Sequence, residues 1–92
     1  MNILYKWLNH EVKLSIKITN VEFQFANGYF FGELLYLYHQ QLDFTEEFVN
    51  SDLKQVMVKN FVLIEPTLKS LGVMFNSNDA KDIIEKVNKA LY

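Results

Sequence analysis

One stretch near the middle of the chain, residues 27–38 with the sequence NGYFFGELLYLY, limits the possible folds more than any other. Eight of the ten residues after Gly28 are apolar, and five of these eight are aromatic. The preceding Asn27-Gly28 pair is a turn signal, because both residue types tolerate positive φ. The segment is much shorter than the ~20 apolar residues of a membrane span. It therefore predicts either a buried strand or a helix that is buried on most sides.

Length and neighbouring patterns favour the helix. No other segment has a matching pattern that would make it a hairpin partner. Glu33 is the main polar interruption of the segment. The apolar side chains would follow helical spacing on two adjacent faces, Phe30, Leu34 and Leu37 on one and Phe31, Leu35 and Tyr38 on the next. A helix that is apolar on nearly all sides is expected at the centre of a bundle.

The N-terminal residues 2–14 have the 3.6-residue period of an amphipathic helix. Ile3, Trp7 and Leu14 would lie on one stripe, with Leu4, Leu8 and Val12 beside it. Asn20 is expected to cap a short second helix in which Val21 and Phe25 lie one turn apart.

Residues 40–50 predict a loop with one helical turn at Thr45–Phe48. Ser51 is the expected N-cap of a helix from Asp52 to Val58, because its hydroxyl can accept from a free backbone N–H. The acidic residue at position 52 also suits a first helical turn.

Residues 60–72, NFVLIEPTLKSLG, again have helical spacing, and Gly72 is a natural helix stop. Pro66 indicates either a bent helix or one that begins near Glu65, and we favour the bent helix. Asn76 or Ser77 would cap a last helix. Its apolar stripe would consist of Ala80, Ile84, Val87 and Leu91, with Ile83 beside it.

Together these patterns predict a single all-α domain over residues 1–92, a bundle of four main helices plus short connecting helices. Half of the residues are hydrophobic and 15% are aromatic, so a chain of this length can form one core that is rich in rings. The expected core residues are Trp7, Phe30, Phe31, Leu34, Leu35, Phe61, Leu68 and Leu71.

Composition excludes several classes of function. The chain has no cysteine, which excludes disulfides and thiolate metal sites and fits a cytosolic protein. All nine basic residues are lysine, and without arginine the chain lacks the usual bidentate reader of base edges, which argues against sequence-specific nucleic-acid binding. His10 and His39 are far apart and have no further ligands at metal-binding spacing, so we expect no metal and no cofactor.

Signs of catalysis are weak. Glu33 inside an apolar helix is a candidate catalytic acid, but such a residue more often reaches the surface or pairs with a lysine or a backbone group. No phosphate-binding loop, dinucleotide fingerprint or nucleophile elbow is present. We therefore expect a protein that is not an enzyme.

Charge is distributed unevenly although the net charge is only −2. Residues 1–21 carry three lysines and one glutamate, residues 22–53 carry six acidic residues and no lysine, and residues 54–71 carry three lysines and one glutamate. A solvated lysine face is the simplest explanation for each single residue. The lysines that could instead form a filament-binding surface are Lys6, Lys13, Lys17, Lys54, Lys59 and Lys69.

Three segments resemble a calponin-homology domain. They are ILYKWLN at 3–9, NGYFFGELLYLY at 27–38 and VKNFVLIEPTLKSLGV at 58–73. The third is the most specific, because EPTLKSLGV keeps a proline that helix propensity alone would reject. In detail the chain is most similar to a divergent subgroup at the N-termini of ciliary and flagellar proteins, such as the sperm flagellar proteins. It departs from the broader family at Asn27, where aspartate is usual.

The resemblance implies a cytoplasmic, cytoskeletal interaction module of a cilium or flagellum. Its partners would be tubulin in microtubules, through lysines facing acidic tails, or other axonemal proteins. The family also suggests actin binding as an alternative. A further alternative is a protein-pairing domain without direct filament binding, which would use exposed rings at Phe44, Phe48 and Phe75. Because the chain stops at Leu91-Tyr92 in an apparent helix, we expect it to be the N-terminal part of a longer protein.

Overall fold

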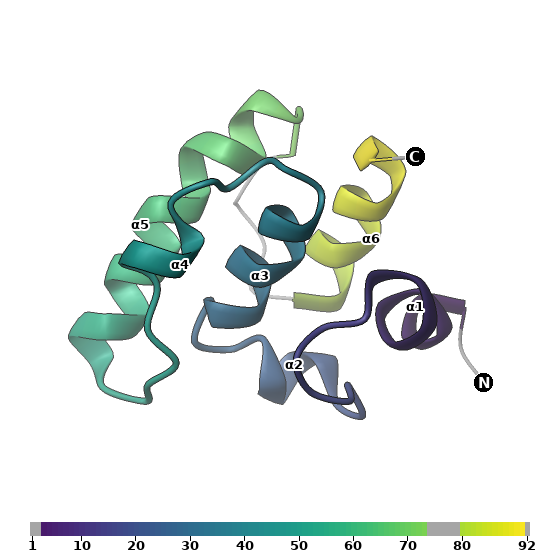
Figure 1. The fold of residues 1–92 in the computed structure, drawn as a ribbon, viewed down its shortest axis with the longest axis horizontal. Coiled ribbons are helices and arrows are strands. Elements are labelled where there is room, and N and C mark those ends of the chain that lie inside the picture. Colours follow the sequence, from purple (N-terminus) through teal and green to yellow (C-terminus); the bar gives the residue numbers. More distant parts are fainter. Residues whose placement is uncertain (1–2, 74–79, 92) are drawn as a thin grey trace.

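The computed structural model describes residues 3–73 and 80–91, and every regular element in these ranges is helical (Figure 1). The predicted all-α class, with short helices connecting the main ones, is confirmed. The expected cap at Asn76 or Ser77 lies outside the described residues. The elements are α1 (Ile3–Lys6), the π-helical segment η1 (Trp7–Val12), α2 (Val21–Gln24), α3 (Tyr29–Leu37), α4 (Phe44–Glu47), α5 (Lys54–Ser70) and α6 (Ala80–Leu91).

Helix α3, which forms most of the stretch NGYFFGELLYLY, lies in the middle of the fold between α5 and α6 (Figure 1). Both faces of its first two turns are buried, and the ring of Phe31 packs edge-on against Phe25 with centroids 4.9 Å apart. The prediction for Leu37 was wrong, because this side chain is 41% exposed where the helix ends. The segment is therefore a central helix whose last turn reaches the surface.

Most of the expected core residues are buried. Phe61 and Leu71 are only half-buried and pack at the edge of the core. In α6, Ile83, Ile84 and Val87 are buried and Leu91 is half-buried. The side chain of Ala80, which was also expected on this stripe, lies outside the described ones. The fully or nearly buried members of the expected set are Trp7, Phe30, Phe31, Leu34, Leu35 and Leu68.

The N-terminal helix is shorter than predicted. It ends at Val12, because Lys13 adopts left-handed φ of 59° and its N–H bonds to the Leu8 oxygen five residues back at 3.0 Å. This wider π-type spacing shifts the buried stripe to Leu4, Trp7, Leu8 and Val12. Ile3 was wrongly placed on that stripe, since it is 84% exposed.

Helix α5 is one continuous element instead of the two predicted. Residues 51–53 precede it, and the Ser51 hydroxyl accepts from the Leu53 N–H at 3.1 Å, so Ser51 does not cap the helix. The helix runs through Pro66, which lacks the N–H but leaves the helix unbroken. It ends at Ser70, and Gly72, the predicted stop, follows two residues later with a φ of 77°.

The end of α5 is a Schellman motif, which satisfies carbonyl groups of its last turn. The Gly72 N–H bonds to the Lys69 oxygen at 3.0 Å, and the Val73 N–H bonds to the Leu68 oxygen at 2.9 Å. Leu68 and Val73 are both buried, as this motif usually requires. The Leu-Gly-Val sequence at 71–73 thus turns the chain from α5 toward α6.

Candidate functional site

Three lysines follow one another along the N-terminal part of the chain, and we call them the N-terminal lysines. Lys6 ends α1, Lys13 follows η1, and Lys17 lies in the loop before α2. All three side chains are exposed. Within residues 3–73 and 80–91 the ion pairs are Lys59–Glu47 and Lys86–Asp82, so none uses an N-terminal lysine.

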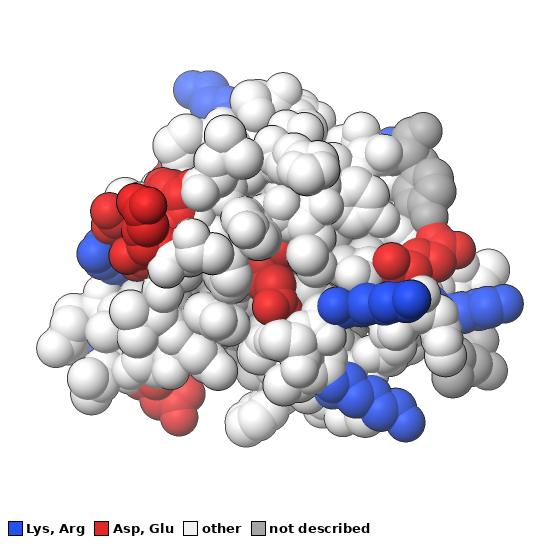
Figure 2. Space-filling model, viewed as in Figure 1, with Lys and Arg blue, Asp and Glu red and all other residues white. Residues whose placement is uncertain are grey.

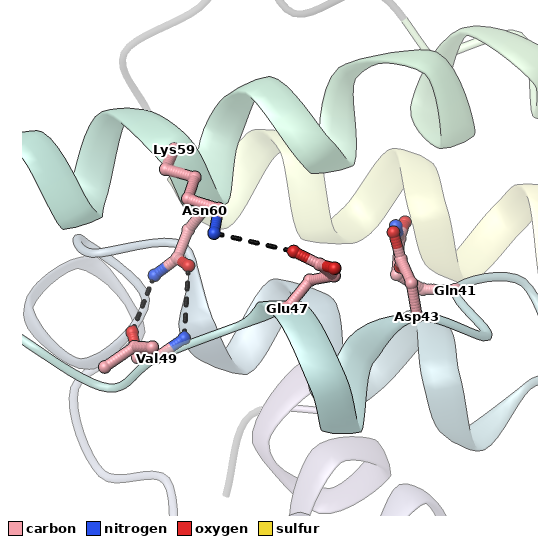
Figure 3. A network of polar contacts seen from close by, with 6 residues as sticks. All are labelled: Gln41, Asp43, Glu47, Val49, Lys59 and Asn60. Carbon is pink, nitrogen blue, oxygen red and sulfur yellow. Dashed lines mark hydrogen bonds and ion pairs between the residues drawn. The ribbon is translucent and has the colours of Figure 1, made fainter.

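The other three candidate lysines, Lys54, Lys59 and Lys69, lie exposed on α5. Helix α5 and α1 are on opposite sides of the molecule with α3 between them (Figure 1). The six lysines therefore form two separate groups. In the second group, Lys59 Nζ lies 3.5 Å from Glu47 Oε2 (Figure 3).

Acidic residues surround the beginning and end of α4. Asp43 precedes this helix, and Glu46 and Glu47 belong to it. In the space-filling view, acidic side chains gather over α4, on the left of the face, and blue lysine side chains gather at the right, over α1 and the adjoining loop (Figure 2). Each end of this face also carries side chains of the opposite sign, so the two ends differ in the balance of charge (Figure 2).

The loop that carries Lys13 and Lys17 is held by side chains. Asn9 Nδ2 donates to the Ile18 oxygen at 2.9 Å, and Asn9 Oδ1 accepts from the Ile18 N–H at 2.7 Å. Gln24 Nε2 donates to the Lys17 oxygen at 3.1 Å. The asparagine of the Trp-Leu-Asn motif thus closes the loop against η1 and fixes where the lysines emerge.

Glu33 has a structural partner in the same loop. Its Oε1 accepts from the Ser15 N–H at 2.8 Å and from the Ser15 hydroxyl at 3.1 Å. The side chain is half-buried, and it connects α3 to the N-terminal loop. These hydrogen bonds give the carboxylate of Glu33 a structural role, so its place in the central helix needs no catalytic explanation.

Asn60 is a fully buried polar residue. From the sequence it is recognisable only as part of the segment at 58–73, with no role of its own. Its Nδ2 donates to the Val49 oxygen at 2.8 Å, and its Oδ1 accepts from the Val49 N–H at 3.3 Å (Figure 3). The same Nδ2 donates to the Asn27 oxygen at 2.9 Å. Gly28 packs directly on it, since a Cβ built there would lie 3.0 Å from the Asn60 Cβ. Asn60 and Gly28, which belong to two of the family-like segments, therefore pack directly against each other.

Gln41 makes a second buried joint between the loop before α4 and α5. Its Nε2 donates to Asp43 Oδ1 at 2.7 Å and to the Leu63 oxygen at 3.2 Å. The Thr67 hydroxyl, from the Glu-Pro-Thr sequence of α5, donates to Gln41 Oε1. Like Asn60, Gln41 and Thr67 therefore have a structural role, because their polar groups bond to neighbouring segments of the fold.

The described residues contain no group of three or more His, Cys, Asp or Glu side chains that could hold a metal ion. No helix in the described part of the chain is long and apolar enough to cross a membrane. The prediction that exposed rings of Phe44 and Phe48 could pair with another protein was wrong. These side chains are only 6% and 7% exposed, because they pack on α3 at Tyr36 and Gly32. Phe75 lies outside the described residues.

Comparison with known proteins assigns the chain to a family. Residues 4–92 match the family described as CH-like domain in sperm protein. The chain therefore belongs to this family of calponin-homology-like domains, and the resemblance predicted from its motifs is confirmed.

Among curated relatives, the chain is similar to sperm flagellar protein 2 from several mammals. It is 42% identical to the rat protein, 43% to the pig protein and 42% to the human protein, each over 84 residues. These alignments cover 89% of this chain but only 5% of each relative. No solved structure matches the chain.

Proposed function

We propose that this domain is a non-enzymatic docking module of a flagellar or ciliary protein, and that it binds the acidic surface of tubulin in microtubules. The observation that carries the proposal is the set of N-terminal lysines. They are exposed cations that form no ion pair within residues 3–73 and 80–91. A partner's carboxylates could therefore bind them without displacing a carboxylate of this chain. Attraction of this kind acts at a distance and is weakened by salt.

The geometry around these lysines supports a preformed surface. Asn9, Gln24 and Glu33 hold the loop that presents Lys13 and Lys17, so little backbone ordering would accompany binding. An open hollow beside Lys6, lined also by Ile3, Trp7, Glu11 and Asn88, adds apolar contact area. The exposed Ile3 side chain stands at its edge.

The distribution of charge supports a defined orientation. Asp43, Glu46 and Glu47 lie next to or within α4, which is at the opposite end of the view from α1 (Figure 1). An acidic partner would attract one side and repel the other. The name of the relatives, sperm flagellar protein, supports a place for this chain in an axoneme.

Co-sedimentation with microtubules tests the proposal, with filamentous actin run in parallel. The first variant is Lys6→Glu, Lys13→Glu and Lys17→Glu in one chain, and its matched control is Lys54→Glu, Lys59→Glu and Lys69→Glu. Both variants change the net charge of −2 by the same six units. We expect the first to lose microtubule binding and the second to keep it.

Equal loss in the two triple variants would contradict a localised docking surface. Absence of wild-type pelleting with microtubules at low salt would overturn direct tubulin binding by this domain. Pelleting with actin alone would support the actin-binding alternative in its place. Circular dichroism of each variant confirms that it is folded.

A further inference from the structure

The outer side of α5 carries an open hollow of about 340 Å³ whose lining is apolar in the middle and charged at its ends. Val58 and Val62 in this lining are 54% and 59% exposed. The half-buried Phe61 ring is supported from below by Phe31, with centroids 6.1 Å apart. The lining residues are Lys54, Met57, Val58, Phe61, Val62 and Glu65, and we call this set the α5 stripe.

The α5 stripe is symmetric about the point between Lys59 and Asn60. Lys54 and Glu65 are equally far from this point along the helix, and so are the apolar pairs Met57 with Val62 and Val58 with Phe61. The separation between Lys54 and Glu65 is eleven residues, which is close to three helical turns, so both lie on one side of the helix. The charge pattern is therefore self-complementary when the helix is reversed.

We propose that α5 packs antiparallel against α5 of a second copy of this chain, around a two-fold axis through this point. Each Lys54 would then face Glu65 of the other copy, and the apolar side chains between them would cover one another. A two-fold contact must use the same surface on both copies, which the α5 stripe satisfies. A parallel pair would instead place Lys54 against Lys54 and Glu65 against Glu65.

This contact is separate from the proposed tubulin surface. Because α5 and α1 lie on opposite sides of the fold, a dimer through α5 leaves both sets of N-terminal lysines exposed (Figure 1). The dimer does not depend on tubulin binding, and either proposal can fail alone.

A contact through one helix per copy is small compared with the 1,200–2,000 Å² that stable interfaces typically bury, so we expect a dissociation constant on the order of 100 μM. Sedimentation equilibrium of the purified chain from ~10 μM to ~1 mM covers this range. We expect a reversible monomer–dimer equilibrium in the wild-type chain.

Charge reversal distinguishes the proposed pairing from any other association. Lys54→Glu alone and Glu65→Lys alone should each weaken dimerisation at least about tenfold, since each places like charges opposite one another. The double variant K54E/E65K should restore it, because both ion pairs re-form with exchanged signs. The two single variants, each weakened alone, should associate when mixed.

Lys69→Glu and Glu46→Lys are the matched controls, since they make the same charge changes outside the α5 stripe and should leave dimerisation unchanged. Circular dichroism confirms that each variant is folded. A wild-type chain that remains monomeric at ~1 mM would overturn the proposal. So would single reversals without effect, or a double variant that fails to recover.

Discussion

The side-chain amide of Asn60 donates to the backbone oxygen of Asn27 at 2.9 Å, across 33 residues of sequence. The same Nδ2 donates to the Val49 oxygen, and Asn60 Oδ1 accepts from the Val49 N–H. One buried side chain thereby attaches both the turn before α3 and the loop after α4 to α5. These segments are irregular, so their backbone groups depend on this side chain for partners.

Asn60→Ala should therefore destabilise the domain strongly. It leaves the part-buried N–H and oxygen of Val49 and the buried oxygen of Asn27 without that partner, and we expect a loss of about 2–4 kcal/mol in the free energy of unfolding. Urea denaturation followed by circular dichroism measures the loss. The matched control is Asn50→Ala, which removes one bond from Asn27 at an exposed residue and should cost about 1 kcal/mol or less. Equal losses in the two variants would contradict the special role of Asn60 in attaching these two segments to α5.

Gly32 is required because of space. A Cβ built there would lie 2.5 Å from Phe48 Cε2 and 3.0 Å from Phe44 Cδ1. Gly32→Ala should cost up to about 2 kcal/mol, because overpacking of about 1–3 kcal/mol opposes a gain of about 1 kcal/mol in helix propensity. In the Phe48→Leu background the cost of Gly32→Ala should fall by at least about 0.5 kcal/mol. A double-mutant cycle in urea tests this, and additive effects would contradict the contact.

Gly72 is required because of its backbone angle. Among the described residues, and apart from its chain neighbours, no heavy atom lies within 4 Å of a Cβ built there, but φ is 77°. Gly72→Ala should therefore cost about 1–2 kcal/mol through left-handed strain alone, and Gly72→Asn should recover part of this, because asparagine tolerates that region better. Thermal unfolding of both variants provides the measurement. An alanine variant as stable as the wild-type chain would exclude strain as the reason for this glycine.

Local chemistry made several elements predictable from the sequence. Asn20 caps α2 as expected, with its Oδ1 accepting from the Phe23 N–H at 3.0 Å. The turn at Gly28 and the end of α5 at Gly72 follow from glycine at positive φ. The apolar content of α3 placed that helix at the centre. In each case the signal lies within a few residues of the element that it determines.

The remaining features depend on tertiary contacts that periodicity does not report. Ser51 is a good cap by type, yet its hydroxyl turns to Leu53 and the helix begins later. The left-handed turn at Lys13 ends η1 early and moves Lys17 into a loop. The candidate lysines were identified by type, but only the arrangement of α1 and α5 divides them into two groups (Figure 1).

Salt should control binding at the N-terminal lysines. Raising the ionic strength from ~0.01 to ~0.15 M shortens the screening length from about 30 to about 8 Å, and we expect at least about a tenfold loss in microtubule affinity. Dimerisation through the α5 stripe, which is largely apolar, should change much less over the same range. Microtubule binding that is insensitive to salt would contradict an electrostatic surface.

The most direct measurement compares binding to intact microtubules with binding to microtubules whose acidic C-terminal tails have been removed by limited proteolysis. The wild-type domain and the N-terminal triple variant are titrated against both at low salt. If Lys6, Lys13 and Lys17 bind the tails, the wild-type domain loses most of its affinity on trimmed microtubules and the variant binds neither form. Equal affinity of the wild-type domain for intact and trimmed microtubules would contradict the proposed mode of docking.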